Sequence, residues 1–205
     1  MCEPTACGAA RCCPPPAYCD NCDLLVGLDG LHVLEVERGP DRLTITLESP
    51  SALMGCAGCG VVAGSHGRRT VELIDAPCFG RPVRVMWRKR TWECLEPLCP
   101  VGVFTEQDEG VAAPRALLTV RACWWAVGQL RREHASVSGL ARQLGTTWRT
   151  VWRSIKPLLE AMAADPARFD GVTTLGVDEH IVRHEALLFR MEVRDLHRLV
   201  VVAAG

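Results

Sequence analysis

The sequence predicts an α+β protein of several domains, in which a small β-rich domain precedes a helical one. Apolar and polar residues alternate over several stretches of residues 31–93, as they do in strands with one buried face. Beyond Pro114 the apolar residues recur at three- and four-residue steps instead, which is typical of helices. The 205 residues also exceed the usual size of one domain, about 100–150 residues.

Composition is that of a globular protein and predicts a cytoplasmic location. Hydrophobic residues make up 48% of the chain and charged residues 23%. The first residues contain no basic region followed by an apolar run, so no signal peptide is predicted. No stretch approaches the ~20 apolar residues of a membrane span. Thiols in the cytosol more often bind metal than form disulfides, which bears on the twelve cysteines of the chain.

Residues 1–23 are expected to form a disordered extension rich in cysteine and proline. Cys19 and Cys22 have a spacing that suits a metal ion. No obvious second pair is found among the remaining cysteines of the extension, Cys2, Cys7, Cys12 and Cys13. Disorder is therefore favoured over a second zinc site in this segment.

The β-rich domain is expected over residues 24–111. Two alternating stretches with a turn between them, residues 31–48, predict a hairpin. Residues 71–74 and 82–87 predict two further strands. Basic and tryptophan side chains gather along the last of these strands and just beyond it: Arg81, Arg84, Arg88, Lys89, Arg90, Trp87 and Trp92. Such a ribbon could lie along a nucleic-acid backbone, although the tryptophans are better explained as cover for a small core.

Two cysteine pairs form the candidate metal site of this domain: Cys56, Cys59, Cys94 and Cys99. Two thiols separated by two residues can face one metal ion from a tight turn, and a second pair completes the tetrahedral thiolate set that structural zinc prefers. Gly58 and Gly60 suit such a turn because glycine tolerates a left-handed backbone. The strands between the pairs can return the chain to its starting point. Two disulfides, or unrelated buried thiols, are the alternatives.

A helical domain is expected over residues 112–165. Its first helix is predicted to run from about Leu117 to Glu133. Ser136 can cap a short second helix, which Gly145 ends. Thr146 or Thr147 can then cap a third helix that continues to about residue 159.

The spacing of three residues in this domain is that of a helix-turn-helix. A small residue at Ala141 lets two helices cross closely, Gly145 takes the turn, and Val151 locks the second helix on the first. The outward faces provide the candidate DNA-binding residues, which are Thr147, Arg149, Thr150 and Arg153, with Arg142 from the preceding helix. Arginine suits bidentate contact to guanine, and threonine suits a phosphate or a thymine methyl group.

Charge supports this interpretation of the helices. Residues 115–156 carry eight Lys or Arg side chains against the single acid Glu133, which is the footprint expected of a phosphate-binding module. A solvated helix face is the alternative. Trp148 and Trp152 fit a core or a partner surface better than a base-reading role.

Several motifs, taken in their order along the chain, resemble those of ISL-three-type insertion-sequence transposases. The zinc-binding head of that family is similar to residues 56–60, 79–83, 92–99 and 104–107 of this chain. Its helix-turn-helix is similar to residues 138–146 and 150–151, and the strand that opens its catalytic domain is similar to Leu175-Gly176-Val177-Asp178-Glu179-His180. The resemblance covers residues 24–184.

The resemblance implies a ribonuclease-H-like catalytic domain, of which residues 166–205 would be a truncated start. In the family, two Asp and one Glu hold two Mg²⁺ or Mn²⁺ ions that activate water and then a 3′ hydroxyl for DNA transposition. Asp178 corresponds to the first of these three carboxylates. The other two are expected far downstream of it, so enzymatic activity of this chain alone is uncertain and strand transfer is expected to be lost.

Three functions follow from these observations as hypotheses. The first is a bacterial, nucleoid-associated transposase fragment that binds the double-stranded terminal repeats of an insertion sequence without contact to a membrane. It could act as a homodimer. The second is a transcription regulator or inhibitor built from the same zinc head and helices. The third is a nuclease completed by another chain.

Overall fold

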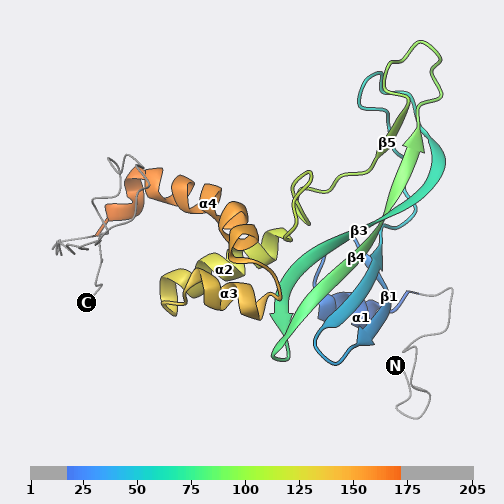
Figure 1. Ribbon diagram of the computed structural model, residues 1–205. Helices are drawn as coiled ribbons and strands as arrows, with labels where there is room; N and C mark the ends of the chain where they lie inside the picture. The colour runs from blue at the N-terminus through green and yellow to red at the C-terminus, as the bar shows by residue number, and fades with distance from the viewer. Residues whose placement is uncertain (1–17, 172–205) are drawn as a thin grey trace, which may run out of the picture. The chain divides into compact units, whose positions relative to one another are not determined.

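The computed structural model describes residues 18–171, and it confirms the α+β class (Figure 1). Over these residues the chain forms a five-stranded mixed sheet, four α-helices and a short 3-10 helix. The whole chain divides into two compact units, Met1–Leu159 and Glu160–Gly205. Helix α4 (Trp148–Ala164) begins in the first unit and ends in the second, which also contains the 3-10 helix η1 (Pro166–Phe169).

The predicted first hairpin is present. Strands β1 (His32–Arg38) and β2 (Leu43–Glu48) pair antiparallel, and the backbone amide of Gly39 donates to the carbonyl of Arg42 across the turn, at 3.0 Å. Every second residue of β2 is buried, beginning at Leu43. This period of two is the sequence alternation that predicted the strand.

The two later strands are much longer than the sequence suggested. Strands β3 (Gly64–Cys78) and β4 (Arg81–Glu93) form an antiparallel hairpin whose two-residue loop has positive φ at both positions, 51° at Phe79 and 71° at Gly80. Such loops match the right-handed twist of the strands that they join. The hairpin returns the chain to its starting point, as the alternation between the cysteine pairs predicted.

The order of strands in the sheet is β1-β2-β4-β3, and β4 runs parallel to β2. The two cysteine-bearing loops lie at the open end of the β3–β4 hairpin, before β3 and after β4 (Figure 1). Strand β5 (Val103–Thr105) pairs with the last residues of β4. The sheet therefore continues up to the segment that carries the cysteines.

The core of the sheet is built around Trp87, which is 1% exposed. Its indole nitrogen donates to Oγ of Ser49 at 3.0 Å, so the buried polar group has a partner. Trp92 is also buried. Both tryptophans thus lie in the interior of the protein, in agreement with the prediction that they cover a small core.

Helix α1 (Asp20–Val26) begins inside the segment expected to be disordered. The helix forms there because Asp23 attaches it to β1: the carboxylate accepts from the backbone amide of Val33 and lies 2.7 Å from Nδ1 of His32. Spacing rules do not reveal this contact, which joins residues nine and ten positions apart. Residues 1–17 lie outside the described part of the chain.

Helix α2 (Val120–Arg132) is fixed to the sheet by a buried carboxylate. Asp75, on β3, is fully buried. It accepts from the hydroxyl of Thr119, the N-cap of α2, at 2.6 Å, and it forms a two-oxygen ion pair with Arg121. Arg121 also donates to the carbonyl of Val26 at the end of α1. One carboxylate thus joins three elements.

None of the four α-helices of residues 18–171 is both long enough and apolar enough to cross a membrane.

Candidate metal centre and basic helical pair

The first cysteine pair lies in a tight loop between β2 and β3. The amide of Cys56 donates to the carbonyl of Val61, and the amide of Gly60 donates back to the carbonyl of Cys56, each at 2.8 Å. Gly60 has a φ of 76°, which glycine adopts without strain. Inside this loop the amide of Gly58 lies 3.4 Å from Sγ of Cys56. The loop therefore turns its amides toward the sulfur atoms. Of the two glycines that suit the turn, only Gly60 adopts the left-handed backbone.

The second pair follows β4 directly. Cys94 donates its amide to the carbonyl of Gly102 at 2.8 Å, and Cys99 donates its amide to the carbonyl of Glu96 at 3.1 Å. The two loops close on each other tightly: a Cβ atom at Gly58 would lie 2.5 Å from Cγ2 of Val101 and 3.3 Å from Sγ of Cys99. Any side chain at Gly58 would push the loops apart.

The four sulfur atoms of Cys56, Cys59, Cys94 and Cys99 lie within 4.8 Å of one another. Cys56 and Cys99 are 3.7 Å apart, and Cys59 and Cys94 are 3.5 Å apart. These separations are too long for disulfides, whose S–S length is about 2.0 Å. In a tetrahedral site with metal–sulfur distances of about 2.3 Å, neighbouring sulfur atoms are about 3.8 Å apart. The observed separations approach this value. The four cysteines could therefore hold one metal ion.

The electrostatics of the cluster agree with its geometry. The Gly58 amide, which points at the sulfur, lowers the pKa of the Cys56 thiol to about 7. The Glu96 amide also favours the thiolate of Cys94, but burial and the neighbouring thiols outweigh it and raise the pKa of Cys94 to about 12. One thiolate forms readily and further negative charges do not. A cation bound between the sulfur atoms would favour the thiolate form of all four cysteines.

Helices α3 (Val137–Gln143) and α4 form a pair around a turn at Gly145, whose φ is 60°. Ser136 caps α3, its hydroxyl accepting from the amide of Gly139. Apolar residues on the inner faces of the pair are fully or almost fully buried: Leu140, Ala141, Leu144, Val151 and Ile155. The predicted helices and the break between them are thus present, and we call α3 and α4 together the helical pair.

Most of the residues expected to contact DNA are exposed on this pair. Arg142, Thr147, Arg149 and Arg153 are exposed, and Thr150 is half-buried. The hydroxyl of Thr147 accepts from the amide of Thr150 at 3.2 Å, so Thr147 caps α4. Trp148 and Trp152 are 53% and 41% exposed, which excludes the core role considered for them.

Arg84 holds the turn of the helical pair on the sheet. Its guanidinium donates to the carbonyl of Leu144 at 3.1 Å and to that of Gly145 at 2.6 Å, and its Nε lies 3.2 Å from Glu72. Burial lowers the pKa of Arg84, as expected for a cation taken out of water. The sequence gave no indication of this role, since Arg84 stands in a basic ribbon 60 residues before the turn.

Replacing Arg84 by methionine should destabilise the protein by about 1–3 kcal/mol. The reason is that two carbonyls at the end of α3 lose a charged donor in a site with little access to water. Urea unfolding checks this, with Arg88→Met on the same strand as the control, because Arg88 is 44% exposed and its ion pair with Glu48 is expected to contribute little. Equal loss of stability in both variants would contradict the conclusion that Arg84 holds the turn of the helical pair on the sheet.

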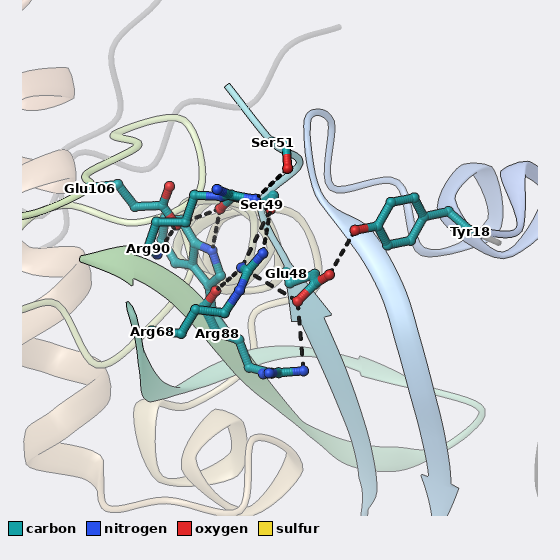
Figure 2. Close-up of polar contacts among 9 residues, drawn as sticks. Tyr18, Glu48, Ser49, Ser51, Arg68, Arg88, Arg90 and Glu106 are labelled. Atoms are coloured by element: carbon teal, nitrogen blue, oxygen red, sulfur yellow. Dashed lines mark hydrogen bonds and ion pairs between the residues drawn. The ribbon is translucent and has the colours of Figure 1, made fainter. Parts of the chain in front are cut away.

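The remaining cations of the basic ribbon are largely engaged inside the protein. Arg88 pairs with Glu48, as does Arg68 of the neighbouring strand β3, and Glu48 also accepts from Tyr18 (Figure 2). Arg90 donates to Ser49 and Ser51. Arg81 donates to the carbonyls of Gly39 and Pro40. These contacts join the ribbon to the end of β2 and to the first hairpin. They explain much of the basic character of the ribbon without nucleic acid.

Asp178, the candidate catalytic carboxylate, lies outside the described residues. Comparisons of the chain with protein-family models, with curated proteins and with solved structures return no match.

Proposed function

We propose that this chain is the DNA-binding part of an insertion-sequence transposase of the ISL-three type. In this proposal the four cysteines hold a structural zinc ion, and the helical pair binds duplex DNA at the terminal repeats of the element. The observation that carries the proposal is the exposed start of α4, where Arg149 and Arg153 stand one helical turn apart next to a capped turn.

The donor set supports zinc as the metal. Four thiolates favour zinc or iron over the harder cations, and a closed set of four leaves no position for water or substrate. Such a site is structural and not catalytic. The site lies at the open end of the β3–β4 hairpin, where a bound ion would hold the two loops of irregular backbone together.

The helical pair supports binding in the major groove. In helix-turn-helix proteins the N-terminal residues of the second helix contact base edges. Here that position holds exposed arginines, whose planar guanidinium groups suit the O6 and N7 acceptors of guanine. Arg142 on the neighbouring helix suits a phosphate, and Thr147 and Thr150 flank the same surface.

Asp178 is proposed as one metal-binding carboxylate of the catalytic domain. By the resemblance, strand transfer needs two further carboxylates and two Mg²⁺ or Mn²⁺ ions. The proposal assigns recognition of DNA to this chain, and it assigns no catalytic step to the described residues.

Replacing Arg149 or Arg153 by alanine should weaken specific DNA binding by about 1–3 kcal/mol each if the side chain reads a base. Fluorescence anisotropy with a duplex selected from random sequences by the native chain measures the effect. Arg132→Ala is the matched control, because Arg132 is exposed at the end of α2 and lies outside the helical pair. Unchanged affinity in both test variants would mean that α4 does not recognise the DNA sequence.

The location of the binding sites in the genome separates the transposase fragment from a transcription regulator. Binding sites mapped in cells by chromatin immunoprecipitation should lie in terminal repeats. If they lie in promoters instead, the chain is a transcription regulator that uses the same surface.

A further inference from the structure

A cavity of about 240 Å³ opens between the sheet and the segment that leads into α2. Strands β3 and β4 form one wall, and residues 105–107 and 112–116 form the other. It lies apart from both the cysteine cluster and the helical pair. Three of its lining side chains are cations: Arg69, Lys89 and Arg115.

Lys89 is an unusual buried cation. The residue is 7% exposed, yet no carboxylate among residues 18–171 lies within ion-pair distance of its ammonium group. Its Nζ lies 4.1 Å from the centre of the Trp87 ring and donates one hydrogen bond, to Oε1 of Gln107 at 2.8 Å. An ammonium group has three donors, and a buried lysine is almost always paired. Burial lowers the pKa of Lys89, which reflects the loss of water around its charge.

Arg69 and Arg115 add to the positive charge without partners of their own. Arg69 stands directly opposite Lys89 in the register of β3 and β4, and like charges at this position repel each other. Within the described part of the chain, no hydrogen bond or ion pair engages the guanidinium group of Arg69 or of Arg115. Arg115 has a φ of 62°, a conformation that is uncommon for residues other than glycine.

One carboxylate, that of Glu106, also lines the cavity. Its Oε1 accepts from the hydroxyl of Ser49 and from the amide of Arg90, each at 2.6 Å. Glu106 is therefore engaged by the sheet, and the lining retains more positive than negative charge. Gln107 is also fixed, because its amide donates to the carbonyl of Ala112 at 2.6 Å.

We propose that this cavity binds a phosphate group, as a monoester or a diester, held by Arg69, Lys89 and Arg115. A phosphate relieves the repulsion between Arg69 and Lys89 and supplies acceptors for the unused donors of all three side chains. Guanidinium groups match phosphate oxygens in bidentate geometry, and an ammonium group binds phosphate as a point charge. A volume of about 240 Å³ exceeds the roughly 30 Å³ share of one water several-fold, which leaves room for such a group.

The phosphate site does not depend on the DNA-binding role of the helical pair, since its residues belong to other elements. Its ligand can be a small phosphate, such as a nucleotide, or a phosphate of a nucleic-acid backbone. The test therefore needs one arm for each source.

In the first arm, the full chain is titrated with inorganic phosphate and with a nucleoside 5′-monophosphate, against the unphosphorylated nucleoside, by isothermal calorimetry. In the second, duplex DNA is titrated at several salt concentrations. Arg69→Ala and Arg115→Ala carry the test because both residues are exposed and should fold normally. Lys89→Met complements them, with thermal melting to verify that it folds. Arg38→Ala, which removes an exposed charge from β1, is the control.

We expect phosphate to bind with one-to-one stoichiometry, and Arg69→Ala and Arg115→Ala each to weaken it at least tenfold while Arg38→Ala does not. If Arg69→Ala and Arg115→Ala lose affinity only for duplex DNA, the ligand is a phosphate of the nucleic-acid backbone, and this result supports the site equally. The proposal is overturned if neither arm distinguishes these variants from Arg38→Ala. Because Arg149 and Arg153 are unchanged throughout, that failure leaves the proposed DNA recognition untouched.

Discussion

Replacing Cys56 by serine should abolish metal binding and unfold the loops around the β3–β4 hairpin opening. Cys56 is the most buried of the four cysteines, at 3% exposure, and the structure gives its sulfur an amide donor from Gly58. Structural zinc sites supply folding free energy directly, on the order of 10 kcal/mol in small domains. Loss of one of four ligands should therefore lower the melting temperature sharply. Metal analysis of the purified protein and thermal unfolding measure the two effects.

Cys78→Ser is the matched control for this experiment. Cys78 is an exposed, free cysteine at the opposite end of the same hairpin, and it lies outside the cluster. The Cys78→Ser protein should still bind one metal ion per chain, and its melting temperature should not change. A native chain that is folded without metal, or a Cys56→Ser chain that melts normally, would refute the structural metal site. The identity of the ion in the native protein tests zinc separately.

Replacing Asp75 by alanine should destabilise the protein by about 3–5 kcal/mol. Removing one member of a buried ion pair leaves the other charge without compensation, which costs about this much. Arg121 is 34% exposed, so water can reach part of it and the loss should lie near 3 kcal/mol. The N-cap of α2 loses a partner in addition, because the hydroxyl of Thr119 donates to the same carboxylate.

Chemical denaturation at neutral pH measures the effect of Asp75→Ala, with Glu37→Ala as the control. Glu37 is exposed on β1, and its removal should change stability by less than about 0.5 kcal/mol. A loss below about 1 kcal/mol at Asp75 would mean that the ion pair does not join the sheet to α2. A double change, Asp75→Leu with Arg121→Met, should be less harmful than Asp75→Ala because it leaves no buried charge alone.

Local patterns in the sequence predicted the elements and the cysteine cluster well. The alternation of residues 31–48 gave the first hairpin, and Ser136 and Gly145 gave the start and the end of α3. The four cysteines were found from spacing alone, because each pair needs only a short loop to bring its thiols together. These features depend on residues that are close in the chain.

Contacts between distant residues were not predictable in the same way. Periodicity identifies strands but not their neighbours, so the parallel pairing of β2 with β4 was not foreseen. In the sequence, Arg84 and Lys89 belong to a basic ribbon that could lie along a nucleic-acid backbone, and charged residues are usually exposed, so their burial is not predicted. The local sequence gives no indication that Asp75, which directly follows the predicted strand of residues 71–74, is buried. Hydrogen-bond partners that local patterns do not reveal lie 18 residues from Lys89, 46 residues from Asp75, and 60 and 61 residues from Arg84.

The position of the cysteine loops also determines how β3 can align with β4. The loops lie on either side of the last pair of the hairpin, Gly64 and Glu93. Sliding one strand by two residues, the smallest slip that keeps every side chain on its own face, would move one loop by about 6.6 Å relative to the other. That displacement exceeds the 4.8 Å within which the four sulfurs lie. Misaligned hairpins would therefore be unable to bind the ion, and metal binding would select a single alignment during folding.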